Sequence, residues 1–425
     1  MPLVAIARRR DGRTRKDTVA AAQDDTPLNL RVDPACASDL DRSVRKLHFF
    51  LSLALLSVAV ATLAGCSKSS DQGSAPAAKT IKIGLAAVKS GSDAQIGGTM
   101  LQGSQIAIDE WNAKGGVLGQ QIETISLDDE GKPDKAVNVA QALVDDGVSA
   151  VLGHLNSGCT IPASRVYNQA KVIQITPGST NPQYTEQGYP YAFRICGRDD
   201  QQGQVAGAYL RDTLKLDKIA ILHNKTAYGE GLATEVKKTF EAKGGTVVVF
   251  DGIGQDDNDF SANVSKIKGS GAQAFFWGGM YGQGGPLCVK MRQAGLNIPF
   301  VSGDGCFDQT FIDTVGANAS DIYLTFGKDY HSAPAAQPFL DKYKAKYGPE
   351  GAYSVYGYDA ANVYLTAVQQ AGTLDPDKVA AVMKSQSFDT ILGKVEFDAK
   401  GDVKASGFVL WTIKDGKLQV VPAAQ

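Results

Sequence analysis

The chain has 425 residues, of which 43% are hydrophobic and 21% are charged, and its formal net charge is −2. This composition is typical of a globular protein, and the length favours two domains or one large, discontinuous α/β body. Because the charge is so nearly balanced, nothing in it indicates nucleic acid or an anionic membrane surface as a partner.

The first 65 residues divide into a polar leader and a secretory signal. Residues 1–43 show no sustained apolar period, so they are expected to be disordered or not translated at all. Basic residues then precede the apolar run 47–63, a pattern that predicts a signal peptide over residues 44–65. The run is shorter than the roughly 20 apolar residues of a membrane-spanning helix. A signal so far into a chain indicates that translation begins near Val44.

The signal ends in Leu63-Ala64-Gly65-Cys66, which resembles the lipobox of bacterial lipoproteins. In those proteins the cysteine carries diacylglycerol and becomes the new amino terminus. The resemblance therefore implies an exported, periplasmic protein that is anchored to a membrane through a lipid on Cys66. The alternative is an ordinary cleavage near Ala59-Val60-Ala61, with Cys66 incidental. Residues 66–79 are rich in Ser, Ala and Gly and are expected to form a flexible tether.

Four cysteines remain in the body of the chain: Cys159, Cys196, Cys288 and Cys306. An even number in an oxidising compartment permits disulfides, and local pairing of Cys159 with Cys196 and of Cys288 with Cys306 is the favoured connectivity. Buried free thiols are the alternative. No CxxC or Cys/His spacing indicates a metal site, so none is expected.

From residue 80 the sequence alternates between predicted strands and helices. The apolar patterns predict strands over 81–86, 122–127, 150–153 and 172–175, and helices over 97–112 and from Pro133 to Asp146. A second run predicts strands over 218–223, 246–250, 274–277 and 299–301, and helices over 231–243, 263–268 and 286–294. Strands separated by helices of this length indicate parallel βαβ units, and the repetition predicts two similar α/β lobes.

The sequence contains no motif typical of an enzyme, such as GxSxG, HExxH, a Walker A loop or GxGxxG after a strand. The glycine-rich segment 280–285 is interpreted as a loop, and the glycine cluster within it at residues 282–285 gives only a weak phosphate signal. The acidic triplet at residues 128–130 is typical of a solvated loop. We therefore expect neither catalysis nor a cofactor.

Hydroxyl-rich loops follow two neighbouring predicted strands. One covers residues 154–160 and leads into a helix that contains Pro162, and the other covers residues 176–182. In open parallel sheets ligands bind beyond the carboxyl ends of the strands. Hydroxyls and free N–H groups at a helix amino terminus suit a carboxylate. Helix capping by Ser and Thr is the alternative for each loop.

Four segments in this part of the chain, residues 153–164, 175–182, 193–203 and 228–233, resemble the leucine/isoleucine/valine-binding proteins. These are substrate-binding subunits of branched-chain amino acid ABC importers, and the similarity runs from about Ile81 to near Trp411. It implies a type I periplasmic-binding fold, in which two Rossmann-like lobes joined by three crossovers close on the ligand.

The crossovers would lie near Arg198, Phe326 and Lys404. One lobe would then hold residues 80–198 and 327–404, and the other residues 199–326 and 405–425.

The resemblance also implies a ligand site. Ser157 matches a serine that binds the ligand carboxylate, and Gly178 and Thr180, with Ser179 between them, match a loop that contacts both carboxylate and ammonium. Asp304 matches an acid that pairs with the ammonium from the opposite lobe, and Tyr228 matches a tyrosine that covers the α-amino acid group.

The side-chain pocket would involve Ile96, Met280, Tyr281 and Tyr353. Ile96 and Met280 stand where relatives have aromatic residues, and Asp304 is one methylene shorter than their glutamate. The expected ligand is a small aliphatic, branched-chain amino acid, which a monomer delivers to an ABC permease and ATPase. The alternative is a sensor of the same fold for an amide or another small metabolite.

Overall fold

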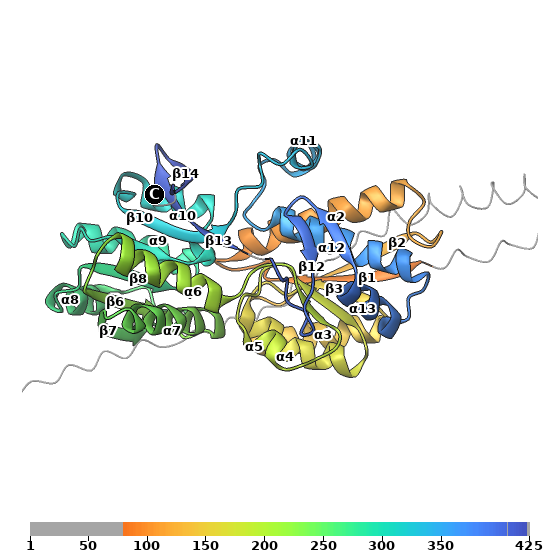
Figure 1. Cartoon of the computed structure of the whole chain (residues 1–425), viewed down its shortest axis with the longest axis horizontal. Coiled ribbons are helices and arrows are strands. Elements are labelled where there is room, and N and C mark those ends of the chain that lie inside the picture. Colours follow the sequence, from red (N-terminus) through yellow and green to blue (C-terminus); the bar gives the residue numbers. More distant parts are fainter. Residues whose placement is uncertain (1–79, 406, 423–425) are drawn as a thin grey trace, which may run out of the picture. The chain divides into compact units, whose positions relative to one another are not determined.

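A computed structural model of the chain describes residues 80–405 and 407–422 (Figure 1). The predicted leader, signal, lipidated Cys66 and tether all lie outside the described residues. The described residues belong to one compact unit. None of the helices within it is both long and apolar enough to cross a membrane.

The first sheet contains five parallel strands in the order β2-β1-β3-β4-β5. Its strands are β1 (Ile81–Ala87), β2 (Ile122–Asp128), β3 (Ala150–Gly153), β4 (Ile173–Thr176) and β5 (Ala192–Arg194). Every residue of β3 and β4 is buried, as expected for parallel strands covered on both faces.

The second sheet has seven strands in the order β14-β13-β10-β9-β8-β6-β7. Its strands are β6 (Lys218–His223), β7 (Thr246–Gly252), β8 (Ala274–Gly278), β9 (Phe300–Ser302), β10 (Ile322–Gly327), β13 (Phe408–Lys414) and β14 (Lys417–Val420). Strands β6 to β10 are parallel and repeat the order of the first sheet, whereas β13 and β14 add an antiparallel edge. The predicted repetition of two α/β units is therefore confirmed.

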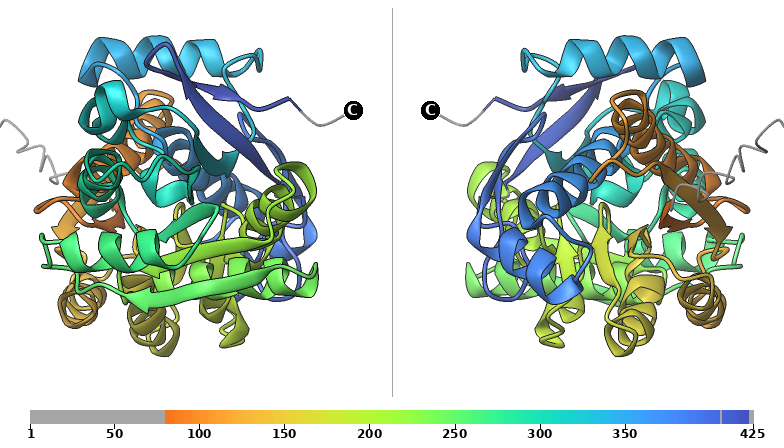
Figure 2. Two further views of the ribbon diagram at one scale, coloured as in Figure 1. Left: turned by 90° about the vertical axis from the view of Figure 1, so that its left-hand side faces the viewer. Right: turned by 90° about the vertical axis from the view of Figure 1, so that its right-hand side faces the viewer.

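Helices cover both faces of each sheet (Figure 2). In Figure 1, α2 and α12 lie on one side of the first sheet and α3 and α4 on the other. The α-helices are α2 (Ala94–Ala113), α3 (Pro133–Asp145), α4 (Ser157–Gln169), α5 (Gln183–Glu186), α6 (Asp199–Ala208), α7 (Ala227–Ala242), α8 (Ser261–Gly269), α9 (Tyr281–Gln293), α10 (Gln309–Val315), α11 (Ala336–Tyr347), α12 (Ser354–Ala371) and α13 (Pro376–Ser385). Short π or 3₁₀ turns cover Tyr209–Thr213, Asp304–Cys306 and Gly316–Asn318.

The chain passes between the two sheets more than once. It leaves the first sheet after β5, and after β10 it returns to form α12, which packs on α2. The hairpin β11 (Ser387–Thr390) and β12 (Gly393–Glu396) follows α13, and β13 then rejoins the second sheet. An isolated parallel bridge between Arg194 and Asp402 joins the end of β5 to the segment that precedes β13.

Helix α9 corrects the prediction that residues 280–285 form a glycine-rich loop. The helix begins at Tyr281, and Pro286 lies inside it. A Cβ added at Gly284 would lie 2.7 Å from Cys306 Sγ, and one at Gly285 would lie 2.8 Å from Thr314 Cγ2. These glycines are therefore explained by close helix packing rather than by a turn.

The four cysteines of the body are free and buried, so the favoured pairing of Cys159 with Cys196 and of Cys288 with Cys306 is wrong and the buried-thiol alternative holds. Cys159 packs between α3, α4 and the first sheet, whereas the Cys196 thiol points to the Ser179 carbonyl oxygen at 3.6 Å. The Cys306 thiol points to the Gly279 carbonyl oxygen at 3.8 Å. Cys288 is buried in the same hydrophobic core as Cys306, and neither forms a disulfide.

Candidate functional site

The carboxyl ends of the strands in both sheets border one small buried cavity. Its lining combines residues that follow β3 and β4 with residues that follow β8 and β9. The cavity is lined by Ile96, Leu155, Asn156, Ser157, Gly178, Tyr228, Met280, Asp304, Gly305 and Tyr353. Its volume is about 20 Å³, which is room for about one water molecule. In this conformation the cavity by itself is therefore too small for a ligand the size of an amino acid.

The predicted site residues divide into two groups in the structure. Those that line the cavity are Ile96, Ser157, Gly178, Tyr228, Met280, Asp304 and Tyr353. Ser179, Thr180 and Tyr281 are buried beside it but do not line it. Tyr281 begins α9 and lies against the backbone of Gln95 and Ile96 instead.

Ser157 is the first residue of α4, and Asn156 precedes it as the helix cap without a side-chain cap hydrogen bond. Ser157 Oγ accepts hydrogen bonds from Ser179 Oγ and from the Asn181 N–H, both at 3.3 Å. The hydroxyl therefore faces the neighbouring loop rather than capping its own helix. Because the free N–H groups of a helix amino terminus carry partial positive charge, this edge of the cavity suits a carboxylate.

The loop 176–182 is shaped by a hydroxyl that the sequence analysis did not single out. Thr176 Oγ1 donates to the His154 carbonyl at 2.7 Å and accepts from the Gly178 and Ser179 N–H groups at 3.3 and 2.9 Å. An added Cβ at Gly178 would lie 2.5 Å from Leu155 Cδ1, so a side chain there would require Leu155 to move. The Thr176 hydroxyl and the close approach of Leu155 thus help to fix the loop conformation that brings Gly178 to the cavity.

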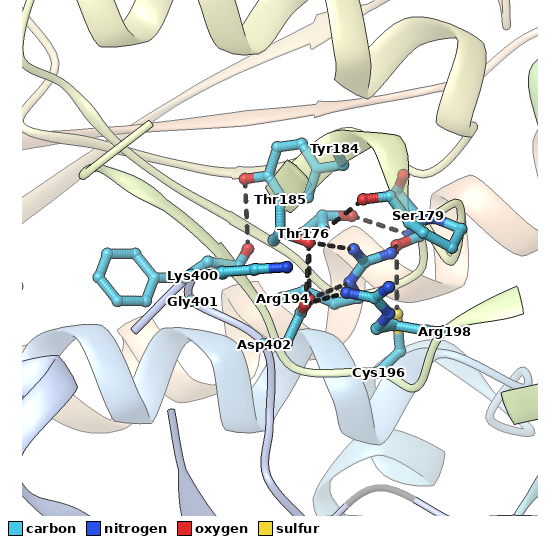
Figure 3. Close-up of polar contacts among 12 residues, drawn as sticks. Thr176, Ser179, Tyr184, Thr185, Arg194, Cys196, Arg198, Lys400, Gly401 and Asp402 are labelled. Atoms are coloured by element: carbon cyan, nitrogen blue, oxygen red, sulfur yellow. Dashed lines mark hydrogen bonds and ion pairs between the residues drawn. The ribbon is translucent and has the colours of Figure 1, made fainter. Parts of the chain in front are cut away.

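A buried arginine supports the same loop through hydrogen bonds to its backbone (Figure 3). Arg194, at the end of β5, donates to the carbonyl oxygens of Ser179 and Asn181, both at 2.9 Å. It also donates to Thr185 Oγ1 at 2.8 Å and to Asp402 Oδ1 at 2.8 Å. Its side chain is fully buried, so these bonds are shielded from water.

Asp402 joins this arginine to a second one. Its Oδ2 accepts a 2.7 Å hydrogen bond from Arg198, and both of its oxygens accept from the Thr185 hydroxyl. Burial alone would raise the pKa of Asp402, but Arg194 and Arg198 hold that pKa below its usual value. Arg194 and Asp402 were not predicted as site residues, although Arg194 lies in one of the family-like segments.

Asp304 provides the negative charge on the other side of the cavity. It lies in the 3₁₀ turn after β9, and only 4% of its surface is exposed. Its Oδ1 accepts from Gln202 Nε2 at 2.7 Å and from the Tyr228 hydroxyl at 2.9 Å, and its Oδ2 accepts from the Tyr353 hydroxyl at 2.5 Å. Burial raises the pKa of Asp304, and these hydrogen bonds oppose the shift. The three side chains that donate these hydrogen bonds, Gln202, Tyr228 and Tyr353, are neutral.

A larger cavity of about 280 Å³ adjoins the small one and shares Asn156, Ser157, Tyr228 and Met280 with it. The amino-terminal ends of α4 and α7 both contribute to its wall, and Lys225 lines it as well. The cleft between the two sheets therefore continues outward from Ser157 and Tyr228.

His154 directly follows β3 and lies in a closed hydrogen-bond network. Its Nδ1 is 2.6 Å from Asp129 Oδ2, and its Nε2 is 3.0 Å from the Tyr167 hydroxyl. All three side chains are almost completely buried, and none lines the cavity. The network supports the end of β3 without presenting a reactive group to the cleft.

Fold and cleft together define a class of proteins that enclose a small molecule between two α/β bodies. The chain belongs to the periplasmic binding protein family, whose model matches residues 80–417, and its fold is the predicted type I periplasmic-binding fold.

Relatives at about 40% identity confirm the resemblance to leucine/isoleucine/valine-binding proteins. The chain is 40% identical over 337 residues to a Leu/Ile/Val-binding protein homologue of Brucella abortus, covering 79% of this chain and 91% of the relative. It is 39% identical over 373 residues to an amino acid binding protein of Pseudomonas aeruginosa, covering 87% of this chain and 98% of the relative. These relatives are named as binding proteins, not as enzymes.

Solved structures agree with this assignment. A leucine-binding protein of Thermotoga maritima superposes with a TM-score of 0.76 at 28% identity, covering 81% of this chain and 98% of that one. A branched-chain amino acid transporter substrate-binding protein of Streptococcus pneumoniae, solved with isoleucine, gives a TM-score of 0.74 at 31% identity, covering 81% and 99%.

Proposed function

We propose that this protein binds a small aliphatic amino acid as a zwitterion and delivers it to an ABC importer. The observation that carries the proposal is the arrangement of Ser157 and Asp304 on opposite sides of one buried cavity. Ser157 stands at a helix amino terminus, which suits the ligand carboxylate, and Asp304 is a buried acid, which suits the ammonium. A zwitterion that leaves water needs both charges satisfied, because an unpaired buried charge costs several kcal/mol.

The remaining site residues take their roles from this geometry. Gly178 and Thr180 would offer the carbonyl, hydroxyl and N–H groups of their loop to the α-amino acid group, with Ser179 supporting Ser157 through its hydroxyl. Tyr228 would cover the same group, since its hydroxyl already bonds Asp304 and the Gly305 N–H. Ile96, Met280 and the Tyr353 ring would contact the ligand side chain, and Tyr281 would support Ile96.

Ligand binding would be coupled to closure of the two lobes. We assign residues 80–198 and 327–404 to one lobe and residues 199–326 and 405–425 to the other. On this assignment the hydrogen bond from Tyr353 to Asp304 spans the two lobes. The ligand stabilises the closed state because its two charges contact different lobes.

The ligand class follows from the relatives and from the lining of the cavity. Relatives carry names that specify leucine, isoleucine and valine, and one from Pseudomonas aeruginosa adds threonine and alanine. Ile96 is fully buried and Met280 packs against the apolar core, so the side-chain end of the site suits aliphatic groups. A branched-chain amino acid fits this lining best.

The proposal includes export and anchoring. Residues 44–65 would direct secretion, Cys66 would carry the lipid, and residues 66–79 would tether a monomeric body that faces the permease and its ATPase. Metabolic labelling with a radioactive fatty acid tests the anchor: wild-type protein should be labelled, whereas Cys66→Ala should not. Labelling of the variant would contradict the assignment.

Isothermal titration calorimetry of the purified chain against the twenty amino acids tests the binding function. We expect heat for one or a few aliphatic amino acids. Asp304→Asn should weaken binding by about 2–5 kcal/mol, the usual cost of removing one partner of a buried charge pair. Asp313→Asn is the matched control, because Asp313 is exposed on α10. Absence of heat with every amino acid, or equal affinity of both variants, would refute the proposal.

A further inference from the structure

A second buried acid lies behind the ammonium side of the site. Asp199 is the first residue of α6, where the chain passes from the first sheet to the second, and it is completely buried. Its backbone N–H donates to the Thr180 carbonyl at 2.9 Å. Neither oxygen of its carboxyl group has a hydrogen-bond partner among the described residues. A buried carboxyl group without partners is uncommon, because such groups are normally hydrogen-bonded.

Two neighbouring polar atoms share this property. Thr180 Oγ1 and Gln202 Oε1 are also buried and without a hydrogen-bond partner in the described part of the chain. Gln202 lies one helical turn after Asp199, and its Nε2 donates to Asp304 Oδ1 at 2.7 Å. Thr180 lies beside the Asp199 carboxyl group without forming a hydrogen bond of good geometry to it. The unpartnered atoms are thus mostly acceptors, and an ammonium group is a triple donor.

No charged group in the described part of the chain forms an ion pair with Asp199, although the Arg194 charge opposes the rise in its pKa. The Arg194 guanidinium donates to Asp402, Thr185 and two backbone carbonyls. Arg198 pairs with Asp402, Glu186 and Asp200. The other titratable groups that face Asp199 and Asp304 are Tyr228, Tyr353, Tyr356, Cys196 and Cys306.

We propose that Asp199 and Asp304 form an acid pair that retains one proton in the ligand-free protein, and that the ammonium group of the ligand displaces this proton to solvent. The inference rests on the proposed amino acid binding and deepens it. Asp199 is a positioning residue and does not itself contact the ligand. When the ligand is bound, it adds a second negative charge beside the Thr180 hydroxyl. The step conserves charge, since one carboxylic acid loses H⁺ to water and gains a neighbouring –NH₃⁺.

The electrostatics support this assignment. Burial, with the nearby Asp304 charge, raises the pKa of Asp199 well above its usual value, and burial raises the pKa of Asp304 as well. Two carboxyl groups in one poorly solvated site cannot both ionise at low cost, so they titrate as a coupled pair. An ammonium group bound beside Asp304 lowers that cost, because its positive charge offsets the charge of both carboxylates.

Calorimetry in buffers of different ionisation enthalpy measures the proton directly. The full chain is titrated with L-leucine, L-isoleucine and L-valine at pH 6 in phosphate and in imidazole buffers. The difference in heat should correspond to release of about one proton per ligand bound, as expected for a coupled acid pair. The affinity should also rise with pH, by about tenfold per pH unit below the pKa of the pair, and then level off.

Two variants separate this role from a structural one. Asp199→Asn keeps the shape of the side chain but removes the acid, so binding should persist with proton release reduced at least threefold. Asp200→Asn is the matched control, since Asp200 is the next residue, bonds Arg198 on the outer side and should leave the proton count unchanged.

The outcomes distinguish the two proposals. Binding heat with no proton release in the wild type, or unchanged release in Asp199→Asn, overturns the acid pair while leaving amino acid binding intact. No heat with any of the three ligands overturns both. If Asp199→Asn does not fold, the pH dependence of the wild-type affinity decides alone, and a flat profile between pH 5 and pH 7 refutes the pair.

Discussion

The Tyr353 hydroxyl donates a 2.5 Å hydrogen bond to Oδ2 of Asp304 and so connects the residue that precedes α12 with the turn that follows β9. These residues are 49 positions apart in the sequence and belong to segments that accompany different sheets. The same bond stabilises the approach of the two sides of the cleft and the ionised form of Asp304.

Replacing Tyr353 by Phe should therefore weaken amino acid binding. A hydrogen bond to a charged group contributes about 1.5–3 kcal/mol, so the dissociation constant should rise roughly 10- to 100-fold. Tyr356→Phe is the matched control, because the Tyr356 ring contacts the Tyr353 ring but its hydroxyl does not bond Asp304. Titration calorimetry measures both, and equal affinities for the two variants would show that this bond does not contribute.

Arg194→Lys should destabilise the fold and the site together. Lysine keeps the charge but cannot reach Asp402, Thr185 and both loop carbonyls at once, since it lacks the planar fork of arginine. Breaking a buried ion pair costs about 3–5 kcal/mol, and a residual lysine contact should bring the loss in unfolding free energy to about 2–4 kcal/mol.

Urea denaturation measures this loss. Lys171→Met is the control, because the Lys171–Asp377 pair is more than half exposed on both sides and should contribute less than about 1 kcal/mol. A smaller effect for Arg194→Lys than for Lys171→Met would contradict the structural role given to the arginine.

Two glycines of α2 should respond in opposite directions to replacement by alanine. A Cβ at Gly103 would lie 1.8 Å from the Ser354 carbonyl oxygen on α12, so Gly103→Ala should push the helices apart and destabilise the protein by about 1–3 kcal/mol or more. A Cβ at Gly98 meets no atom within 4 Å, so Gly98→Ala should stabilise the helix by about 0.5–1 kcal/mol. Thermal unfolding distinguishes them, and a shift of the same sign in both would refute the packing argument.

His331 should make stability depend on pH near neutrality. Its Nδ1 is 2.7 Å from Asp329 and its Nε2 is 3.0 Å from Glu350, and these partners raise its pKa to about 8. Because the folded pKa lies above the unfolded value of about 6.5, this stabilisation is present below pH 6.5 and is lost as the pH rises through 8.

The effect should be about 0.5–1 kcal/mol, because the side chain is half exposed and solvent screens the pair. Unfolding of the wild type and of His331→Gln by urea at pH 6 and pH 9 tests it. The wild type should exceed the variant in stability more at pH 6 than at pH 9, and an equal difference at both would contradict the assignment.

Local patterns were sufficient for the architecture. The apolar runs that became β3 and β8, and the proline that begins α3, predict strands and helices because periodicity and backbone geometry act within a few residues. The order of these units then predicted parallel sheets and two repeats, because right-handed βαβ connections allow few alternatives. Several residues of the cavity were predicted through the family resemblance, among them Ser157 and Asp304.

Other features depend on contacts that no local pattern encodes. Arg194 and Asp402 are 208 residues apart, and only the fold brings them together to support the loop 176–182. In the sequence Asp199 is only an acid in a polar segment. Its burial at the start of α6 and its interaction with Asp304 become visible only in the folded structure. The sequence by itself thus determined the class of fold and most of the cavity lining. The tertiary structure decided which charges are buried together, because burial and electrostatic coupling depend on distance in space rather than along the chain.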